Sequence, residues 1–338
     1  MKKSKLLFIL PILFFFYRTH AQNQKFAFVF YNTENLFDWK DDPATDDDEF
    51  TPEGERHWTY NKFEKKINST SKGLLNAVAW DIPAIVGLCE VENRYVIDRL
   101  ISDTPLKSIP FKVIHKESPD PRGIDVAILY NSDVFYPLSY DYFPLKEEDG
   151  SIRKTREILH VSGILSEQDT IHIFVNHWPS RYSGLLETRP LRNKAADLLR
   201  EKIDSVLAIT PSAKIVIMGD FNDQPTDESI EKHLGAKGDG QAGTLVNLSA
   251  AWMKADAGTL KYQSQWFVFD QIIVSSALLK SDTGIFAEPS WAKIVDAEFL
   301  LEPDDRYGGL KPFRTYVGYR YNGGFGDHLP VKLQLSIR

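Results

Sequence analysis

The sequence predicts an α/β fold in which two β-sheets pack together and helices cover their outer faces. Nine short stretches are rich in apolar and β-branched residues, as strands are, whereas only two long stretches repeat apolar residues with the period of a helix. Many strands combined with few, widely spaced helices are typical of packed sheets rather than of a sheet in which a helix follows every strand.

The expected strands are apolar runs of strand length, and several alternate with a period of two residues. In the run from 171 to 177, for example, Ile171, Ile173 and Val175 fall on one side of the strand. The nine expected strands span residues 25–31, 84–89, 111–115, 126–130, 158–165, 171–177, 214–218, 267–275 and 330–337.

The two expected helices are segments in which apolar residues recur on a single helical face. One segment lies between residues 63 and 78, and the other between residues 195 and 206. The apolar positions are Phe63, Ile67, Leu74, Leu75 and Val78 in the first, and Ala195, Leu198, Leu199, Ile203 and Val206 in the second.

The N-terminal segment, residues 1–21, has the pattern of a secretory signal peptide. Three lysines precede a 12-residue apolar run at residues 6–17, and Ala21 supplies a small residue for cleavage. A retained anchor is the alternative, but the run is too short to span a bilayer. We therefore expect residues 22–338 to form one secreted or periplasmic domain, a monomer without integral membrane association.

Net charge limits the partners of the chain. Removal of the N-terminal segment takes away four basic residues and no acid, so the formal net charge moves from −7 to −11. Bulk charge therefore does not attract polyanions, and a phosphate group must be held locally by a cation and a few basic side chains. Cys89 is the only cysteine, which excludes an intrachain disulfide.

Short polar clusters follow several of the apolar runs, the last of them after a weaker run at residues 316–321. The ends of strands are where a rigid scaffold presents reactive side chains. The clusters combine oxygen donors that suit a hard cation with two titratable imidazoles, which suits metal-assisted attack of water on a phosphate ester. The residues are Asn32, Glu34, Glu90, His177, Asp220, Asn222, Asp327 and His328.

Each carboxylate in these clusters also has a structural interpretation. Glu90 ends an otherwise apolar strand and needs either a cation or an ion-pair partner such as Arg94, because an isolated buried charge is costly. Asp220 and Asn222 lie two residues apart on one side of the chain. The acid can orient or deprotonate water and the amide can bind phosphate, but the same pair can form an Asx-turn that caps the strand.

The two histidines need carboxylate partners if they are to stabilise charge on a pentavalent phosphorane. Asp270 lies inside an apolar strand and is the natural partner for one histidine, while Asp125 could serve the other. A purely structural role for His177 or His328 is the alternative.

Two further segments have simpler interpretations. Residues 38–49 contain seven acids and one lysine without periodicity, which favours a solvated loop over a cation site. Residues 238–243 fit the pattern GxGxxG, but they do not link a strand to a helix, so a dinucleotide site is not expected.

Together the clusters resemble the endonuclease/exonuclease/phosphatase superfamily, which includes deoxyribonuclease I. The similar segments read YNTENLFD at residues 31–38, NHWPSR at 176–181, GDFND at 219–223 and GDHLP at 326–330, and they are most like those of secreted bacterial members. The resemblance implies a four-layer α-β-β-α sandwich, with two packed, mostly antiparallel sheets between outer helices. Gly326 departs from the family pattern, in which a serine precedes the final Asp-His.

The resemblance also implies a role for each site residue. Glu90 would be the principal ligand of Mg²⁺, or of Mn²⁺ in its place. The other implied members of the metal region are Asn32, Glu34 and Asp327. Among the implied catalytic residues, Asp220 would orient or deprotonate water, and Asn222 would bind the phosphate. His177 and the Asp270–His328 pair would stabilise the transition state.

Arginines beside these motifs are candidates for binding the substrate, because a guanidinium matches the geometry of phosphate. We favour Arg181, with Arg122 as a second candidate; a surface or helix-start role is the alternative. The resulting prediction is a Mg²⁺-dependent phosphodiesterase, an endonuclease acting on DNA or RNA. The alternatives are a phosphatase, a sphingomyelinase-like phospholipid phosphodiesterase, or a non-catalytic binding scaffold.

Overall fold

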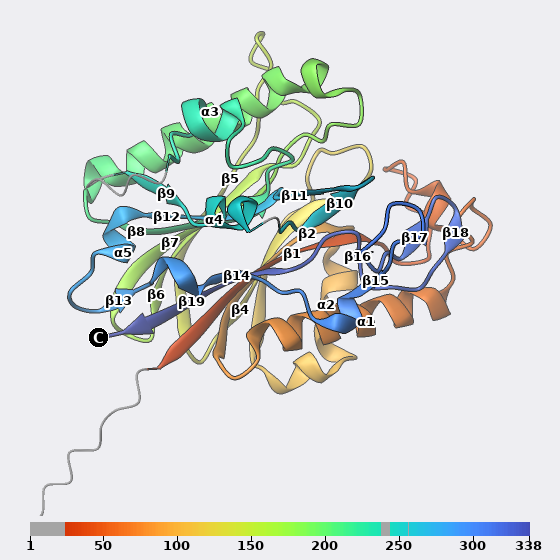
Figure 1. The fold of residues 1–338 in the computed structure, drawn as a ribbon, viewed down its shortest axis with the longest axis horizontal. Coiled ribbons are helices and arrows are strands. Elements are labelled where there is room, and N and C mark those ends of the chain that lie inside the picture. Colours follow the sequence, from red (N-terminus) through yellow and green to blue (C-terminus); the bar gives the residue numbers. More distant parts are fainter. Residues whose placement is uncertain (1–23, 238–243, 256) are drawn as a thin grey trace, which may run out of the picture.

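Two packed β-sheets with helices on both outer faces form the protein (Figure 1). The computed structural model describes residues 24–237, 244–255 and 257–338. The proposed signal peptide and the GxGxxG stretch therefore lie outside the described residues. Among the described residues, no helix is long and apolar enough to cross a membrane.

The first sheet has the strand order β13-β19-β1-β2-β4-β3, and β14 also pairs with β19. Only β1 and β2 are parallel, and the other pairs are antiparallel. Its strands are β1 (Lys25–Leu36), β2 (Ile82–Val91), β3 (Phe111–His115), β4 (Asp125–Asn131), β13 (Ile285–Phe286), β14 (Ala292–Ile294) and β19 (Val331–Ile337).

The second sheet has the order β5-β6-β7-β8-β12-β9, and here only β7 and β8 are parallel. The prediction of two mostly antiparallel sheets is therefore confirmed. Its strands are β5 (Phe135–Phe143), β6 (Ile158–Leu165), β7 (Asp169–His177), β8 (Lys214–Asp220), β9 (Leu245–Asn247) and β12 (Asp270–Ser275).

The two long helices bury apolar faces against the outer sides of the sheets, as predicted. Ile67 of α1 packs in one cluster with Val29 of β1, and Leu199 of α3 packs in another with Phe174 of β7. A third cluster, which includes Met218, fills the space between the sheets. The helices are α1 (Tyr60–Val78), α2 (Arg94–Ser102), α3 (Leu185–Ile209), α4 (Ala250–Lys254) and α5 (Ser276–Leu279).

Shorter elements lie in the connections. The weak apolar run at residues 316–321 forms a small hairpin rather than part of a large sheet. The two-stranded hairpins are β10 (Leu260–Tyr262) with β11 (Gln265–Phe267), β15 (Leu301–Pro303) with β16 (Leu310–Pro312), and β17 (Tyr316–Val317) with β18 (Arg320–Tyr321). Single helical turns are Asp48–Phe50, Pro105–Ser108, Ser229–His233, Pro289–Trp291 and Glu298–Leu300.

Each sheet contains one pair of parallel strands, and a long helix connects the two strands of that pair. Helix α1 connects β1 to β2, and α3 connects β7 to β8. Parallel strands end at the same edge of their sheet. The polar residues at the ends of these four strands are therefore brought to one edge of the sandwich.

The acidic segment at residues 38–49 is a loop that ends in a single helical turn, but the prediction that it is solvated is wrong in part. Asp38 and Asp47 are buried beside Glu92, which lies just past the end of β2. Burial, together with the nearby Asp38 and Asp47 carboxylates, raises the pKa of Glu92 to about 8.

Candidate active site

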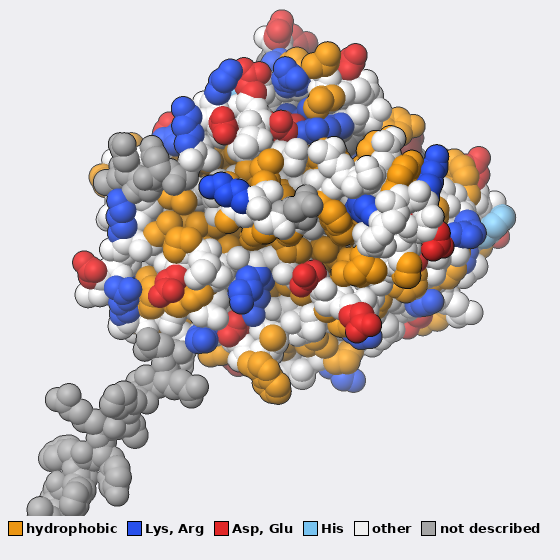
Figure 2. Space-filling model, in the orientation of Figure 1, with side chains coloured by type: hydrophobic (Ala, Val, Ile, Leu, Met, Phe, Trp, Pro, Cys, Tyr) orange, Lys and Arg blue, Asp and Glu red, His pale blue; other side chains and the backbone are white. Residues whose placement is uncertain are grey.

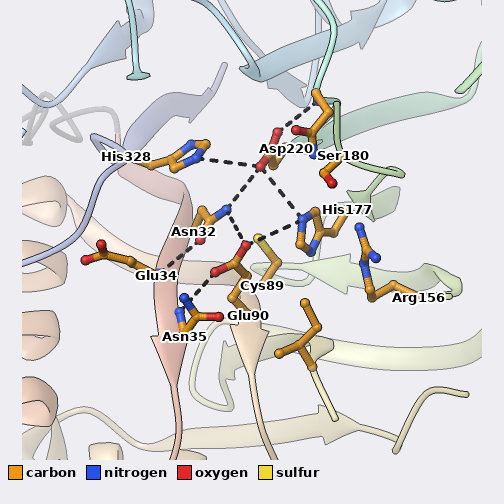
Figure 3. A network of polar contacts seen from close by, with 12 residues as sticks. Asn32, Glu34, Asn35, Cys89, Glu90, Arg156, His177, Ser180, Asp220 and His328 are labelled. Atoms are coloured by element: carbon orange, nitrogen blue, oxygen red, sulfur yellow. Dashed lines mark hydrogen bonds and ion pairs between the residues drawn. The ribbon is translucent and has the colours of Figure 1, made fainter. Parts of the chain in front are cut away.

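The ends of the four parallel strands bring Asn32, Glu90, His177 and Asp220 into contact (Figure 3). The Nδ2 atom of Asn32 donates a hydrogen bond to Oδ2 of Asp220 at 3.0 Å and lies 3.4 Å from Oε1 of Glu90. One amide thus links a carboxylate of the second sheet to a carboxylate of the first.

His177 lies against the same two carboxylates. Its Nε2 atom is 3.7 Å from Oε1 of Glu90 and 3.8 Å from Oδ2 of Asp220. Its Nδ1 atom is buried and has no hydrogen-bond partner among the described residues. Burial, followed by the charges of Arg156 and Arg122, lowers the pKa of His177 well below its usual value, so this imidazole is neutral at neutral pH.

The expectation that Asp125 could pair with His177 is wrong. Oδ2 of Asp125 lies 2.9 Å from Nε2 of His115, and its Oδ1 accepts a hydrogen bond from the backbone of Ser118 at 2.7 Å. The physical reason is strand pairing, because β3 runs antiparallel to β4 and places His115 opposite Ala127, beside the start of β4.

His328 is paired with Asp270, the partner expected for one of the histidines. Nδ1 of His328 lies 2.6 Å from Oδ2 of Asp270, and its Nε2 lies 3.8 Å from Oδ2 of Asp220. Burial alone would lower the pKa of His328, but the carboxylates of Asp270, Asp220 and Asp327 raise it well above its usual value. The imidazole is therefore charged, unlike that of His177.

Asp220 is the centre of the site, because Asn32, His177 and His328 all face its Oδ2 atom (Figure 3). Its Oδ1 accepts a hydrogen bond from the backbone of Asn222 at 2.9 Å, so the Asx-turn also forms. Burial, only partly offset by His328, raises the pKa of Asp220 to about 7.

Asn222 itself has a structural contact in the site. Its Nδ2 atom donates a hydrogen bond to the carbonyl of Trp178 at 3.1 Å. This contact ties the loop after β8 to the loop after β7. Its proposed role in binding phosphate stays a prediction.

Glu90 has no ion pair with Arg94, which was the structural alternative. Arg94 instead pairs with Asp98 one helical turn away, at 2.8 Å. Oε2 of Glu90 accepts a hydrogen bond from the backbone of Asn35 at 3.0 Å. Glu90 occupies a bulge where the pairing of β2 with β4 shifts, and its φ of +58° turns the carboxylate toward β1.

Left-handed backbone is concentrated at these strand ends. Glu34, Asn35, Glu90 and Asn222 have φ values between +50° and +58°. Each such residue costs on the order of 1 kcal/mol or more, and residues of this kind cluster at functional sites. The surrounding hydrogen bonds keep them in place.

Glu34 and Asp327, expected in the metal region, are held by basic side chains. Arg314 contacts Oε1 of Glu34 at 3.3 Å and Oδ2 of Asp327 at 2.8 Å. Glu34 also accepts a hydrogen bond from the backbone of Thr315 at 2.6 Å, and Lys66 lies 3.9 Å from it. These two acids are thus joined to each other through Arg314 and not to Glu90.

Sequence reasoning missed Lys66 and Arg314. Lys66 is buried on α1 between Phe63 and Ile67, and this charged residue on an apolar helical face was the available signal. Burial lowers the pKa of Lys66, while Glu34 and Asp327 act in the opposite direction. Arg314 lies in an irregular connection, where no pattern marks it.

The donor set fits a divalent cation. Oε1 of Glu90 and Oδ2 of Asp220 both approach Asn32 and His177, so two carboxylates share the same neighbours. Carboxylate oxygens of Asp220 and Asp270 also lie within 4.8 Å of each other and of a ring nitrogen of His328, which is protonated and therefore not itself a ligand. Oδ1 of Asp270 is buried and unpaired among the described residues. A cation would neutralise this concentration of negative charge.

Arg181, the residue favoured for binding the substrate, makes hydrogen bonds and ion pairs within the protein. Its Nε donates to the carbonyl of Asn222 at 2.6 Å, and its Nη2 contacts the carboxylates of Asp223 and Asp227. The guanidinium also lies over the ring of Phe269, 4.7 Å from its centroid. Arg122 is different, because it is half-exposed and its contact with Asp120 is long, at 3.4 Å.

Two surface pockets adjoin the site and share Tyr182. One, of about 490 Å³, is apolar and includes Phe269, which precedes Asp270, and Leu260, which pairs with His328. The other, of about 330 Å³, contains several basic side chains. The apolar pocket is lined by Arg181, Tyr182, Leu185, Leu260, Tyr262, Phe267 and Phe269.

The model of the Endonuclease/Exonuclease/phosphatase family matches residues 27–337 of the chain, so the chain belongs to this family. It is a metal-dependent hydrolase that acts on phosphate ester bonds. The comparison with curated proteins finds no match.

Solved structures share the fold at low identity. A family protein from Bacteroides thetaiotaomicron is 13% identical, with a TM-score of 0.55, covering 94% of this chain and 99% of that one. D. rerio TDP2 complexed with a single-strand DNA product is 14% identical, with a TM-score of 0.54 and coverages of 92% and 98%. The human Nocturnin catalytic domain is 14% identical, with a TM-score of 0.51 and coverages of 94% and 95%.

Proposed function

We propose that the protein is a secreted or periplasmic endonuclease that hydrolyses phosphodiester bonds of nucleic acid with Mg²⁺, or Mn²⁺, as its cofactor. The observation that carries the hydrolytic part is the arrangement around Asp220, where one carboxylate oxygen faces Asn32, a neutral His177 and a charged His328. The apolar run at residues 6–17 supports export.

The chemistry follows from the charge states. A bound Mg²⁺, held by Glu90 and Asn32, would polarise the phosphoryl oxygens and offset the charge of the transition state. Asp220, with a pKa of about 7, orients the attacking water and accepts its proton. The water oxygen bonds to phosphorus in line with the ester oxygen that leaves.

The two histidines then stabilise the charge that develops on the phosphoryl group. His328 is kept protonated by Asp270 and presents Nε2 on the side of Asp220. His177 presents a neutral ring from the opposite sheet. Donors fixed by the fold in this way stabilise a transition state more than a mobile donor does, because no reorganisation is needed during reaction.

Nucleic acid is supported by two observations. D. rerio TDP2, which shares the fold, has been solved with a single-strand DNA product. In this chain, the apolar pocket beside the reactive residues offers the rings of Tyr262 and Phe267, and aromatic rings stack on bases of any sequence.

The test is a substrate panel with the purified protein, with Mg²⁺ and with excess chelator. The panel contains supercoiled plasmid, a single-stranded oligonucleotide, bis-p-nitrophenyl phosphate, inositol phosphates and sphingomyelin vesicles. We expect nicked plasmid and shortened oligonucleotide with Mg²⁺ only, and none with the Asp220→Asn variant. Phosphate release from inositol phosphates by a protein that never cuts either nucleic acid would overturn the endonuclease proposal.

A further inference from the structure

A basic pocket is lined in part by Arg156, which lies next to His177 of the site (Figure 3). We use the term basic pocket for the 330 Å³ depression whose charged lining consists of Arg122, Arg153, Lys154, Arg156 and Asp120. Three loops and one helix build it: the connection before β4, the connection before β6, the segment after β7, and the first turns of α3. None of these basic residues except Arg122 was singled out by the sequence.

The basic pocket is fixed to the reactive centre by Arg156. This buried side chain donates from Nη1 to Oδ2 of Asp120 at 2.7 Å, and from Nη2 to the carbonyl of Trp178 at 2.7 Å. Trp178 directly follows His177, and its carbonyl also accepts from Asn222. Figure 3 shows Arg156 next to His177. A group bound in the basic pocket would therefore lie at a defined place relative to the scissile phosphate.

The charge of the basic pocket is not balanced from within. Its lining has four basic side chains and one acid, Asp120, which is already used by Arg156. Arg153 is partly neutralised by Glu147, which lies outside the lining. Lys154 is exposed and has no ion-pair partner among the described residues. The Arg122 side chain is 47% exposed and is held only by the long contact to Asp120, at 3.4 Å. Lys154 and the exposed part of the Arg122 guanidinium thus remain available to an anion.

This local positive charge contrasts with the chain as a whole, whose formal net charge is −7. On the face shown in Figure 2, basic and acidic side chains are interspersed. A concentrated cluster of cations in a concave site attracts anions even when the whole protein repels them. Guanidinium and ammonium groups together suit a phosphate group, through paired and single charged hydrogen bonds.

We propose that the basic pocket binds a second phosphate of the substrate, the one next to the scissile phosphate along a polynucleotide backbone. This inference rests on the proposed function and specifies it further. The enzyme binds two successive phosphates of the backbone, and Arg122 and Lys154 contact the phosphate whose ester bond is not cleaved. The competing explanation is that the basic residues only brace the loops around Asp120.

The test removes the charge from the protein and from the substrate separately. The protein variant is Arg122→Ala with Lys154→Ala, two exposed positions. The substrate is a short oligonucleotide with one cleavable linkage, compared with the same oligonucleotide carrying a neutral methylphosphonate at the neighbouring linkage. The measurement is the ratio of kcat/KM for the charged and the neutral substrate.

We expect the native protein to prefer the charged substrate by about tenfold or more, as the loss of a charged hydrogen bond predicts. In the double variant the ratio should fall toward one, because both changes remove the same contact. The control variant, Lys112→Ala, removes an exposed lysine of β3 near the opposite end of the strands and should keep the native ratio.

An unchanged ratio in the double variant would overturn the inference and leave the endonuclease proposal intact. Fluorescence anisotropy of the oligonucleotide in chelator gives a second readout that needs no turnover. Protein that hydrolyses bis-p-nitrophenyl phosphate but neither binds nor cuts the oligonucleotide would overturn both proposals. The two failures are therefore distinguishable.

Discussion

At the scale of single residues, two histidines that face one carboxylate oxygen have different charge states, one positive and one neutral. His328 has Asp270 at 2.6 Å, whereas Nδ1 of His177 is buried without a partner among the described residues and near Arg156. The difference arises from the neighbours, because both rings are buried. Asp220 thus lies between a donor with full positive charge and a neutral one.

This asymmetry predicts two separate titrations in the metal-free protein. A raised pKa keeps His328 protonated as the pH increases through 7, and a lowered pKa keeps His177 neutral as the pH decreases through 6. NMR of ring-labelled histidine, assigned with His177→Gln and His328→Gln, measures both. Two curves with midpoints near 6.5 would contradict the assignment.

Asp270 acts through His328, so the losses of activity caused by replacing each of the two residues should not add. Asp270→Asn should lower kcat for bis-p-nitrophenyl phosphate by about 10²-fold or more, because the imidazole loses its orientation and its charge. The double variant with His328→Ala should be scarcely worse than His328→Ala alone. Independent, multiplicative losses would show that the pair is not coupled. Asp282→Asn, at a fully exposed carboxylate, is the control.

At the scale of strands and helices, the close approach of β7 and β8 depends on Gly219. A Cβ atom at Gly219 would lie 2.3 Å from the carbonyl oxygen of Asn176, which is backbone and cannot move aside cheaply. Because Gly219 precedes Asp220 and Asn176 precedes His177, any shift here displaces two site residues. The pairing of these strands therefore also sets the geometry of the site.

Gly219→Ala should destabilise the protein by roughly 1–3 kcal/mol and reduce activity in the protein that remains folded. Gly73→Ala is the matched control, because its Cβ would meet only side chains, at 3.5 Å or more, and alanine favours the helix α1. Thermal unfolding and hydrolysis assays measure both. A Gly219→Ala protein as stable and as active as the native one would contradict the argument.

Strands β6 and β7 carry a pair of histidines that makes stability depend on pH. Burial, then the neighbouring His172, lowers the pKa of His160 to about 4. Between the ordinary pKa of about 6.5 and about 4, the unfolded chain takes up a proton that the folded chain excludes. Stability should therefore be complete above pH 6.5 and fall by up to roughly 3 kcal/mol as the pH decreases to 4.

The measurement is the melting temperature of the native protein and of His160→Phe across this range. The phenylalanine ring keeps the stacking on Phe174 but does not titrate. The variant should lose less stability in acid than the native protein. Equal losses in the two proteins would show that other groups dominate.

Elements with a regular pattern were predictable, and irregular ones were not. The nine strands and two long helices are present, because burial imposes periods of two and 3.6 residues. Some ends differ clearly: α3 begins ten residues before the expected segment, β1 continues to Leu36, and β12 begins only at Asp270. Strand β5 was missed because Pro137 argues against a strand, yet it lies at the edge of its sheet beside a bulge. The short hairpins are below the length at which a pattern is detectable.

The sequence predicted which residues form the site better than it predicted which side chains pair with them. Polar residues at strand ends identify Asp220 and His177, since burial there has to be compensated. The partner of Asp125 depends on the register of β3 and β4, and that of Glu34 on Arg314, which is 280 residues away. Neither contact leaves a local trace in the sequence.

At the scale of the whole molecule, the chain is acidic, but the basic pocket forms a small positive region that a phosphate group can contact. The few cations of the basic pocket should make cleavage of nucleic acid sensitive to salt, because each phosphate contact releases counterions. With two to three contacts to a single strand, kcat/KM should fall by roughly tenfold between 50 and 200 mM salt. Hydrolysis of bis-p-nitrophenyl phosphate, which has one phosphate, is the control and should change little. Equal salt sensitivity for both substrates would contradict the prediction.

The most direct test of the account is the recovery of activity when Mg²⁺ is added back to chelator-treated protein. Hydrolysis of bis-p-nitrophenyl phosphate should be absent in excess chelator and return with Mg²⁺ or Mn²⁺, because Glu90 and Asp220 bring two carboxylates to the same imidazole and a cation held by Glu90 would offset their charge. Glu90→Gln should require at least about tenfold more Mg²⁺ for half-maximal activity, as the loss of a charged contact predicts. Full activity in excess chelator, with no metal bound, would contradict the central claim.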